Sequence, residues 1–165
     1  MDKNVVKKDR LRYIKNKASA NLTYLAIIFD VLYFVSIYSS DSGRYYYSIT
    51  IGVSVVYNLL FLLFAFLSSE GLKNYKLGYA IAIIGIGLMQ LVRIFGIPLG
   101  ALKEALDASG KTVMEQGQFN YVVTMLILSA VCCVAAGIIG IIRTLALESH
   151  NKKIASGEVV LEYNK

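Results

Sequence analysis

The sequence holds little of the chemistry that most enzymes need. It has one histidine, His150, among 165 residues. A single histidine near Glu148 forms neither a metal site nor a catalytic triad, because both need further ligands or partners. No Walker phosphate-binding motif is present either. We therefore expect no catalytic residue, no metal site and no cofactor, and predict that the chain is not an enzyme.

Cysteine and proline are also scarce. The two cysteines, Cys132 and Cys133, are adjacent and lie inside an apolar run. They form neither a disulfide framework nor the spaced Cys-x-x-Cys motif of a thiol oxidoreductase, so we interpret them as small core residues. The chain has one proline, which leaves room for long uninterrupted helices.

Charged residues are few and apolar residues abundant. They make up 17% and 56% of the chain, and the mean hydropathy is +0.58. This is too apolar for an ordinary soluble domain. A bilayer core needs about 20 apolar residues in a helix. Four stretches approach or exceed that length, at about 22–38, 48–67, 77–97 and 121–145. The predicted fold class is all-α, a polytopic membrane protein with a four-helix transmembrane bundle forming one domain.

Basic residues are divided unevenly between the two sides of these spans. The N-terminal arm, residues 1–19, carries seven, the second loop carries Lys73 and Lys76, and the tail, 146–165, carries three more. The basic residues of the other side are Arg44, Lys103 and Lys111. Because positive loops stay in the cytoplasm, both termini are predicted to be cytoplasmic, in the plasma membrane. The distribution explains the net charge of +6 without a nucleic-acid partner.

The basic arm has three interpretations. Anionic lipid can attract such a segment, with each basic residue contributing up to about 1 kcal/mol near the surface. The arm could instead dock on a cytoplasmic partner. It could also be a topology signal and nothing more, which is the interpretation we favour.

The third loop, 98–120, is the only long one. Leu99, Leu102 and Leu106 are spaced for one helical face, and Gly110 follows as a stop. We expect a short helix on the outer membrane surface. An outward continuation of the third span fits equally well.

Each span also carries a polar residue at a similar depth. These residues are Asp30, Asn58, Gln90 and Ser129. At a rise of about 1.5 Å per residue, they lie about 10–15 Å inside the outer ends of their spans. Arg93 follows Gln90 by three residues, so the two share a helix face. An isolated charge at this depth costs at least about 2.5 kcal/mol, so we predict that Asp30 pairs with Arg93 and that the two amide side chains bridge the pair.

This polar layer supports a functional and a structural hypothesis. It could bind a substrate or relay an ion. It could instead fix the register and orientation of the helices. We favour the structural hypothesis, because Asp30 has an apparent counter-charge in Arg93, whereas a transport site usually leaves a charge available to its substrate.

The fourth span carries small residues at four-residue spacing. Ser129, Cys133 and Gly137 form one row, and Ala136 and Gly140 form a second. Such spacing permits close helix approach, between molecules or, more often, within a bundle. The third span shows a similar set, Gly78, Ala82, Gly85 and Gly87.

Together these features predict a non-catalytic integral membrane subunit or accessory of a larger complex, such as a transporter. Its partners would be the lipid bilayer and other membrane subunits, or further copies of itself. The alternative is a self-contained homo-oligomeric transporter or channel that uses the polar layer around Asp30 and Arg93.

Overall fold

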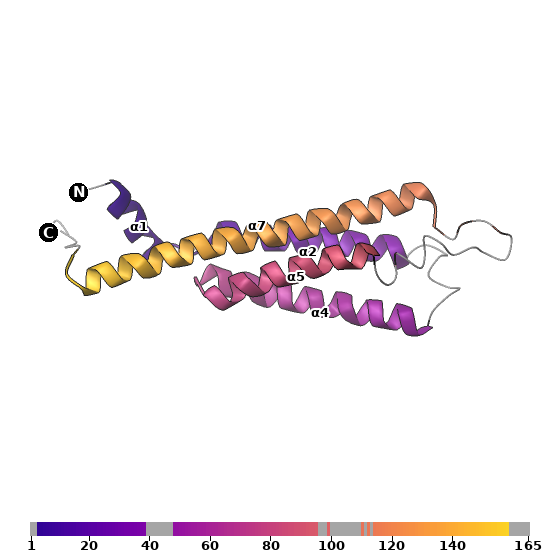
Figure 1. Cartoon of the computed structure of the whole chain (residues 1–165), viewed down its shortest axis with the longest axis horizontal. Coiled ribbons are helices and arrows are strands. Elements are labelled where there is room, and N and C mark those ends of the chain that lie inside the picture. Colours follow the sequence, from indigo (N-terminus) through magenta and orange to yellow (C-terminus); the bar gives the residue numbers. More distant parts are fainter. Residues whose placement is uncertain are drawn as a thin grey trace.

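The chain forms five helices within the residues that the structure describes (Figure 1). The structure is a computed structural model, and it describes residues 3–38, 48–95, 99, 110, 112 and 114–158. The helices are α1 (Lys3–Tyr13), α2 (Lys17–Tyr38), α4 (Ser48–Lys73), α5 (Leu77–Phe95) and α7 (Gln116–Ala155).

Four of these helices are long and apolar enough to cross a membrane. Helices α2, α4 and α5 contain 22, 26 and 19 residues. At about 1.5 Å per residue, each reaches roughly the 30 Å of a hydrocarbon core. The prediction of an all-helical, multi-pass membrane protein is confirmed at this level of length and composition.

The helix limits differ from the predicted ones, mainly at polar ends. Helix α2 begins at Lys17, so it includes the last residues of the predicted arm, and α1 forms most of the rest. Helix α4 continues past residue 67 to Lys73, and α7 extends at both ends into the predicted loop and tail. Hydropathy marks only the apolar part of a helix, whereas backbone hydrogen bonding continues until a cap or breaker ends it. The expected surface helix lies, except for Leu99, outside the described residues.

The four long helices form a closed ring. Helix α7 packs against α2 and α5, and α4 packs against the same two helices from the other side. Successive spans run in opposite directions, so α1 and the end of α7 lie at the same end of the bundle (Figure 1). With 40 residues, α7 is about 60 Å long. It therefore extends past the other spans, and α1 packs against it there.

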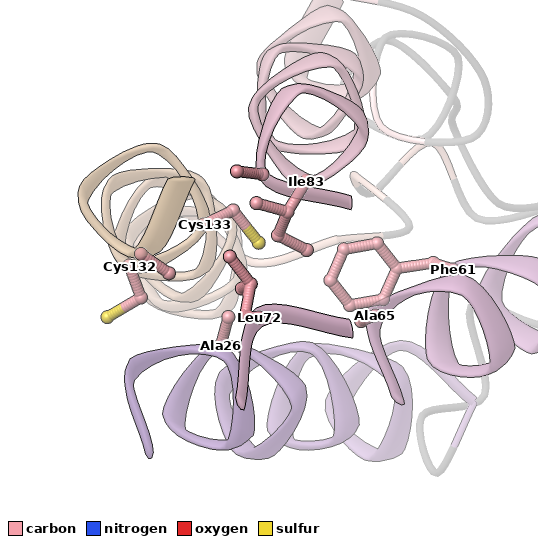
Figure 2. Close-up of a cluster of buried hydrophobic side chains, with 9 residues drawn as sticks. Ala26, Phe61, Ala65, Leu72, Ile83, Cys132 and Cys133 are labelled. Carbon is pink, nitrogen blue, oxygen red and sulfur yellow. The ribbon is translucent and has the colours of Figure 1, made fainter. Parts of the chain in front are cut away.

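An apolar core lies between the four long helices (Figure 2). Cys133 points into the middle of this cluster, and Cys132 lies toward its edge. Both are free and buried. The buried members of this core cluster are Ala26, Phe61, Ala65, Leu72, Ala80, Ile83, Cys132, Cys133 and Ala136. A second buried cluster contains Tyr33, Ile37, Leu99, Met114, Val122 and Leu126.

The small residues of α7 pack inside the bundle. The five residues of the predicted packing face, Ser129, Cys133, Ala136, Gly137 and Gly140, are all buried. A Cβ added at Gly137 would lie 2.7 Å from the carbonyl oxygen of Ala80, and one added at Gly87 would lie 2.7 Å from Cys133 Cβ. The face therefore allows α5 and α7 to approach closely.

The glycines of α5 are not equivalent. Gly87 faces α7, whereas a Cβ added at Gly78 or Gly85 would meet no atom within 4 Å. Of the small residues predicted in the third span, Gly87 therefore packs against α7, whereas Gly78 and Gly85 have open space beside them.

Candidate functional site: a polar layer inside the bundle

Three helices contribute side chains to one buried polar layer. Asp30 comes from α2, Asn58 from α4, and Gln90 and Arg93 from α5. On α5 the latter two continue a buried stripe, because residues three or four apart share a helix face. All four side chains are buried, and Arg93, at 6%, is the most exposed of them.

The guanidinium of Arg93 is the centre of the hydrogen-bond network. Its Nη1 donates to Asp30 Oδ1 at 3.1 Å and to Gln90 Oε1 at 2.8 Å. Its Nη2 donates to Asn58 Oδ1 at 2.8 Å. Gln90 Nε2 in turn donates to Asp30 Oδ1 at 2.8 Å. The ion pair is therefore joined to one amide from its own helix and to a second from α4, and hydrogen bonds to charged groups are about twice as strong as neutral ones.

Two tyrosine rings complete the surroundings of Arg93. Its guanidinium carbon lies 4.4 Å from the ring centroid of Tyr33 and 4.5 Å from that of Tyr57. A planar, weakly hydrated guanidinium binds well over aromatic rings, and the attraction grows when water is absent. The arginine is thus stabilised by its in-plane hydrogen bonds and by ring contacts.

Three polar atoms around the layer have no hydrogen-bond partner among the described residues. They are Asp30 Oδ2, Asn58 Nδ2 and, one turn earlier on α4, Ser54 Oγ. Buried polar atoms are normally paired, so these are the atoms to which a bound water or small ligand would attach.

Ser129, the fifth predicted member of the layer, makes a different contact. Its Oγ donates to the carbonyl oxygen of Ala26 at 3.0 Å. Ala26 lies one turn before Asp30, so Ser129 joins α7 to α2 beside the network rather than contributing to the contacts of Arg93.

A second polar cluster, which the sequence analysis missed, lies at the end of the bundle that carries α1. Asn16 is fully buried there. Its Oδ1 accepts from Arg143 Nη1 at 2.9 Å, its Nδ2 donates to Ser19 Oγ at 2.8 Å, and its backbone N–H donates to the Lys73 carbonyl at 3.1 Å. An asparagine just before a helix, with serine three residues later, is a capping pattern that could have indicated this site.

A smaller group beside Asn16 joins α2 to α4. The Tyr24 hydroxyl donates to Glu70 Oε1 at 3.0 Å, and Lys73 forms an ion pair with the same carboxylate. Lys73 Nζ also donates to the Tyr24 oxygen at 3.0 Å. These contacts fix the end of α4 against α2.

In the part of the chain that the structure describes, no three His, Cys, Asp or Glu side chains gather as a metal site would require. The chain matches no protein-family model, no curated protein and no solved structure.

Proposed function

We propose that this protein is a non-catalytic integral membrane subunit of a larger membrane complex, such as a transporter. The observation that supports the proposal is the set of contacts that Arg93 makes inside the bundle. Its charge is paired with Asp30, its donors reach both Gln90 and Asn58, and two tyrosine rings lie against it. The layer therefore serves to hold three helices together.

This arrangement differs from what a cargo site needs. A site that binds and releases a charged substrate must offer an uncompensated charge, since binding should be favourable but reversible. Here the attraction between Asp30 and Arg93 at 3.1 Å would have to be broken first. Separating them would leave two unpaired charges at membrane depth, which opposes any such cycle.

An open groove between α4 and α5 offers a position for a helix of the partner subunit. It has a volume of about 370 Å³ and an almost wholly apolar lining. Gly85 lines the groove, and a Cβ added to it would meet no atom within 4 Å. Small residues of this kind allow another helix to approach closely. The lining residues are Tyr57, Leu60, Phe61, Phe64, Ala82, Gly85, Ile86 and Met89.

The proposal includes an orientation. Most basic residues lie at the end of the bundle that carries α1 and the end of α7, and basic segments remain in the cytoplasm. We therefore assign this end to the cytoplasmic side of the plasma membrane.

The test compares complexes purified in mild detergent from the native membrane. The chain should elute with a foreign membrane subunit in fixed stoichiometry, identified by its intact mass. Gly85→Leu fills the open groove and should release that subunit while the chain keeps its own fold. Val92→Leu is the control, because Val92 is exposed on the same helix but does not line the groove. A clean homo-oligomer, or retention of the subunit by Gly85→Leu, would contradict the proposal.

One observation favours a second candidate, a self-contained homo-oligomeric transporter. Asp30 Oδ2 and Asn58 Nδ2 are buried and lack partners among the described residues, and such atoms are where a transported ion or small polar molecule would bind. This candidate predicts that Asp30→Asn leaves stability unchanged and abolishes flux in proteoliposomes. The proposed subunit function predicts the opposite, a loss of stability.

A further inference from the structure

The segment that joins α1 to α2 is fixed against the turn that joins α4 to α5. The Tyr75 hydroxyl donates to the carbonyl oxygen of Ile14 at 2.7 Å. Two residues later, the Asn16 N–H donates to the Lys73 carbonyl at 3.1 Å. The segment between α1 and α2, which we call the elbow, is therefore held in a fixed position at this corner of the bundle.

Tyr75 is well suited to hold this corner. Its backbone lies in the left-handed region, with φ of 54°, which turns the chain sharply between the two spans. Burial raises the pKa of the Tyr75 phenol, against the opposing charge of Arg143. The hydroxyl therefore keeps its proton and remains a donor to Ile14 throughout the physiological pH range.

The outer side of this corner exposes lysines together with apolar and aromatic side chains. Tyr13 is 69% exposed and Ile14 is 53% exposed. Lys15 and Lys76 are exposed beside them. We call the exposed set the basic rim, and it consists of Tyr13, Ile14, Lys15, Lys17, Lys76 and Tyr79.

The basic rim lies where a membrane surface would meet the bundle. It follows directly on the ends of three apolar helices that can span a bilayer. Tyrosine rings favour this interface, and lysines there extend their ammonium groups to the level of the phosphates. Lys76 already lies with its Nζ 6.0 Å from the ring centroid of Tyr79, which combines both features in one pair.

Among the described residues, the nearby carboxylates form their ion pairs with residues outside the basic rim. Glu70 forms its ion pair with Lys73 and accepts from Tyr24, and Lys15 lies close enough for its charge to attract this carboxylate without forming an ion pair. Asp9 lies 3.4 Å from Arg12 and 3.6 Å from His150. The lysines of the rim therefore retain positive charge for an external anion.

We propose that the basic rim binds the headgroups of anionic phospholipids. The lysine ammonium groups bind the headgroup phosphate, and Tyr13 and Ile14 insert among the neighbouring lipids. Because Tyr75 holds the elbow in place, the charges are arranged before the lipid arrives, which reduces the entropy lost on binding. This inference does not depend on a partner subunit, so it can fail or succeed separately from the proposed function.

The experiment titrates the purified full chain in dodecyl maltoside with phosphatidylglycerol or phosphatidylcholine, and counts bound lipids by native mass spectrometry. The unsubstituted chain should prefer phosphatidylglycerol. Lys15→Gln with Lys76→Gln should weaken that binding about tenfold or more, as expected for two charges near the headgroups. The control, Lys152→Gln with Lys153→Gln, removes two exposed lysines from the projecting end of α7 and should bind within about twofold of the unsubstituted chain.

Tyr75→Phe gives a second, charge-neutral test. It keeps the ring and every charge but removes the hydroxyl that holds Ile14. Binding of phosphatidylglycerol should fall a few-fold while all lysines remain, because the elbow is no longer held in place.

Three outcomes would overturn the proposal. The unsubstituted chain could bind both lipids equally, which would point to an acidic protein as the partner of the rim. The two lysine pairs could have equal effects, which would indicate a general charge effect. Millimolar inorganic phosphate could displace the lipid fully, which would make free phosphate the ligand.

Discussion

The contacts of Arg93 explain why an arginine is needed at this position. A guanidinium offers five N–H donors in one plane and two open faces. In this structure the plane serves Asp30, Gln90 and Asn58, and rings from α2 and α4 lie against it. A lysine would keep the charge, but its ammonium cannot reproduce the planar fork. The residue therefore joins three helices in a way that no other side chain could.

A double-mutant cycle tests this structural role. Asp30→Asn and Arg93→Gln should each destabilise the protein, since each leaves one unpaired charge. In soluble interiors this costs roughly 3–5 kcal/mol, and in membranes less, because the remaining side chain can find water. The double variant should regain part of the loss, since no lone charge remains. The measurement is thermal unfolding in detergent, and purely additive losses would argue against the pair.

Asn16 gives a second prediction at this scale. Asn16→Ala removes a helix cap, which alone costs about 0.5–2 kcal/mol, and it leaves Arg143 without its amide partner. We expect a loss in the free energy of unfolding of roughly 2 kcal/mol or more. Asn21→Ala, at an exposed position of the same helix, is the matched control and should stay within about 0.5 kcal/mol. Equal effects of the two variants would contradict the role of Asn16.

The sequence indicated part of the polar layer but not all of it. The spacing of apolar runs gives the depth of a residue, and an isolated charge at that depth requires a partner, so the pairing of Asp30 with Arg93 was predictable. Depth does not give the direction in which a residue faces around its helix. For that reason the contact of Ser129 with Ala26, and the placement of both tyrosine rings over the arginine, required the structure.

The candidate spans were predictable in number more than in extent, whereas helix α1 was not predicted. Four apolar runs indicated four spans, and four of the described helices are long and apolar enough to cross a membrane. Their ends were misplaced because polar residues such as Lys73 continue a helix that hydropathy would end. The pairing of elements is decided by small residues. Gly87 and Gly137 allow α5 and α7 to approach closely, and Gly71 of α4 lies against the ring of Tyr79 in α5 in the same way.

Two glycine substitutions test this account of helix packing. A Cβ at Gly137 would lie 2.7 Å from a backbone oxygen of α5, which cannot move aside as a side chain could. Gly137→Ala should therefore cost about 1–3 kcal/mol, as overpacked cores do. Gly85→Ala adds the same methyl group to open space and should be neutral or stabilise by up to about 1 kcal/mol, because alanine favours the helix. Thermal unfolding in detergent measures both. A tolerated Gly137→Ala would show that α5 and α7 do not pack closely.

At the scale of the whole molecule, charge distribution and helix direction agree. Alternating spans bring α1, the turn between α4 and α5, and the end of α7 to one end of the bundle (Figure 1). This is the end at which most lysines and arginines lie. The order of residues along the four long helices therefore explains three features of the bundle. Its middle is apolar, a buried polar layer lies near one end, and the basic residues gather at the opposite end.

Cysteine labelling in sealed cells tests the orientation that we propose. An impermeant thiol reagent should modify Thr112→Cys from outside, and should reach Asn74→Cys and Asn151→Cys only after the membrane is opened, since basic segments stay in the cytoplasm. Asn74 suits this test because it is exposed in the turn between α4 and α5. The unsubstituted chain, whose two cysteines are buried, sets the background. Labelling of Asn74→Cys in sealed cells would reverse the orientation, and labelling of both Asn74→Cys and Thr112→Cys there would contradict four alternating spans.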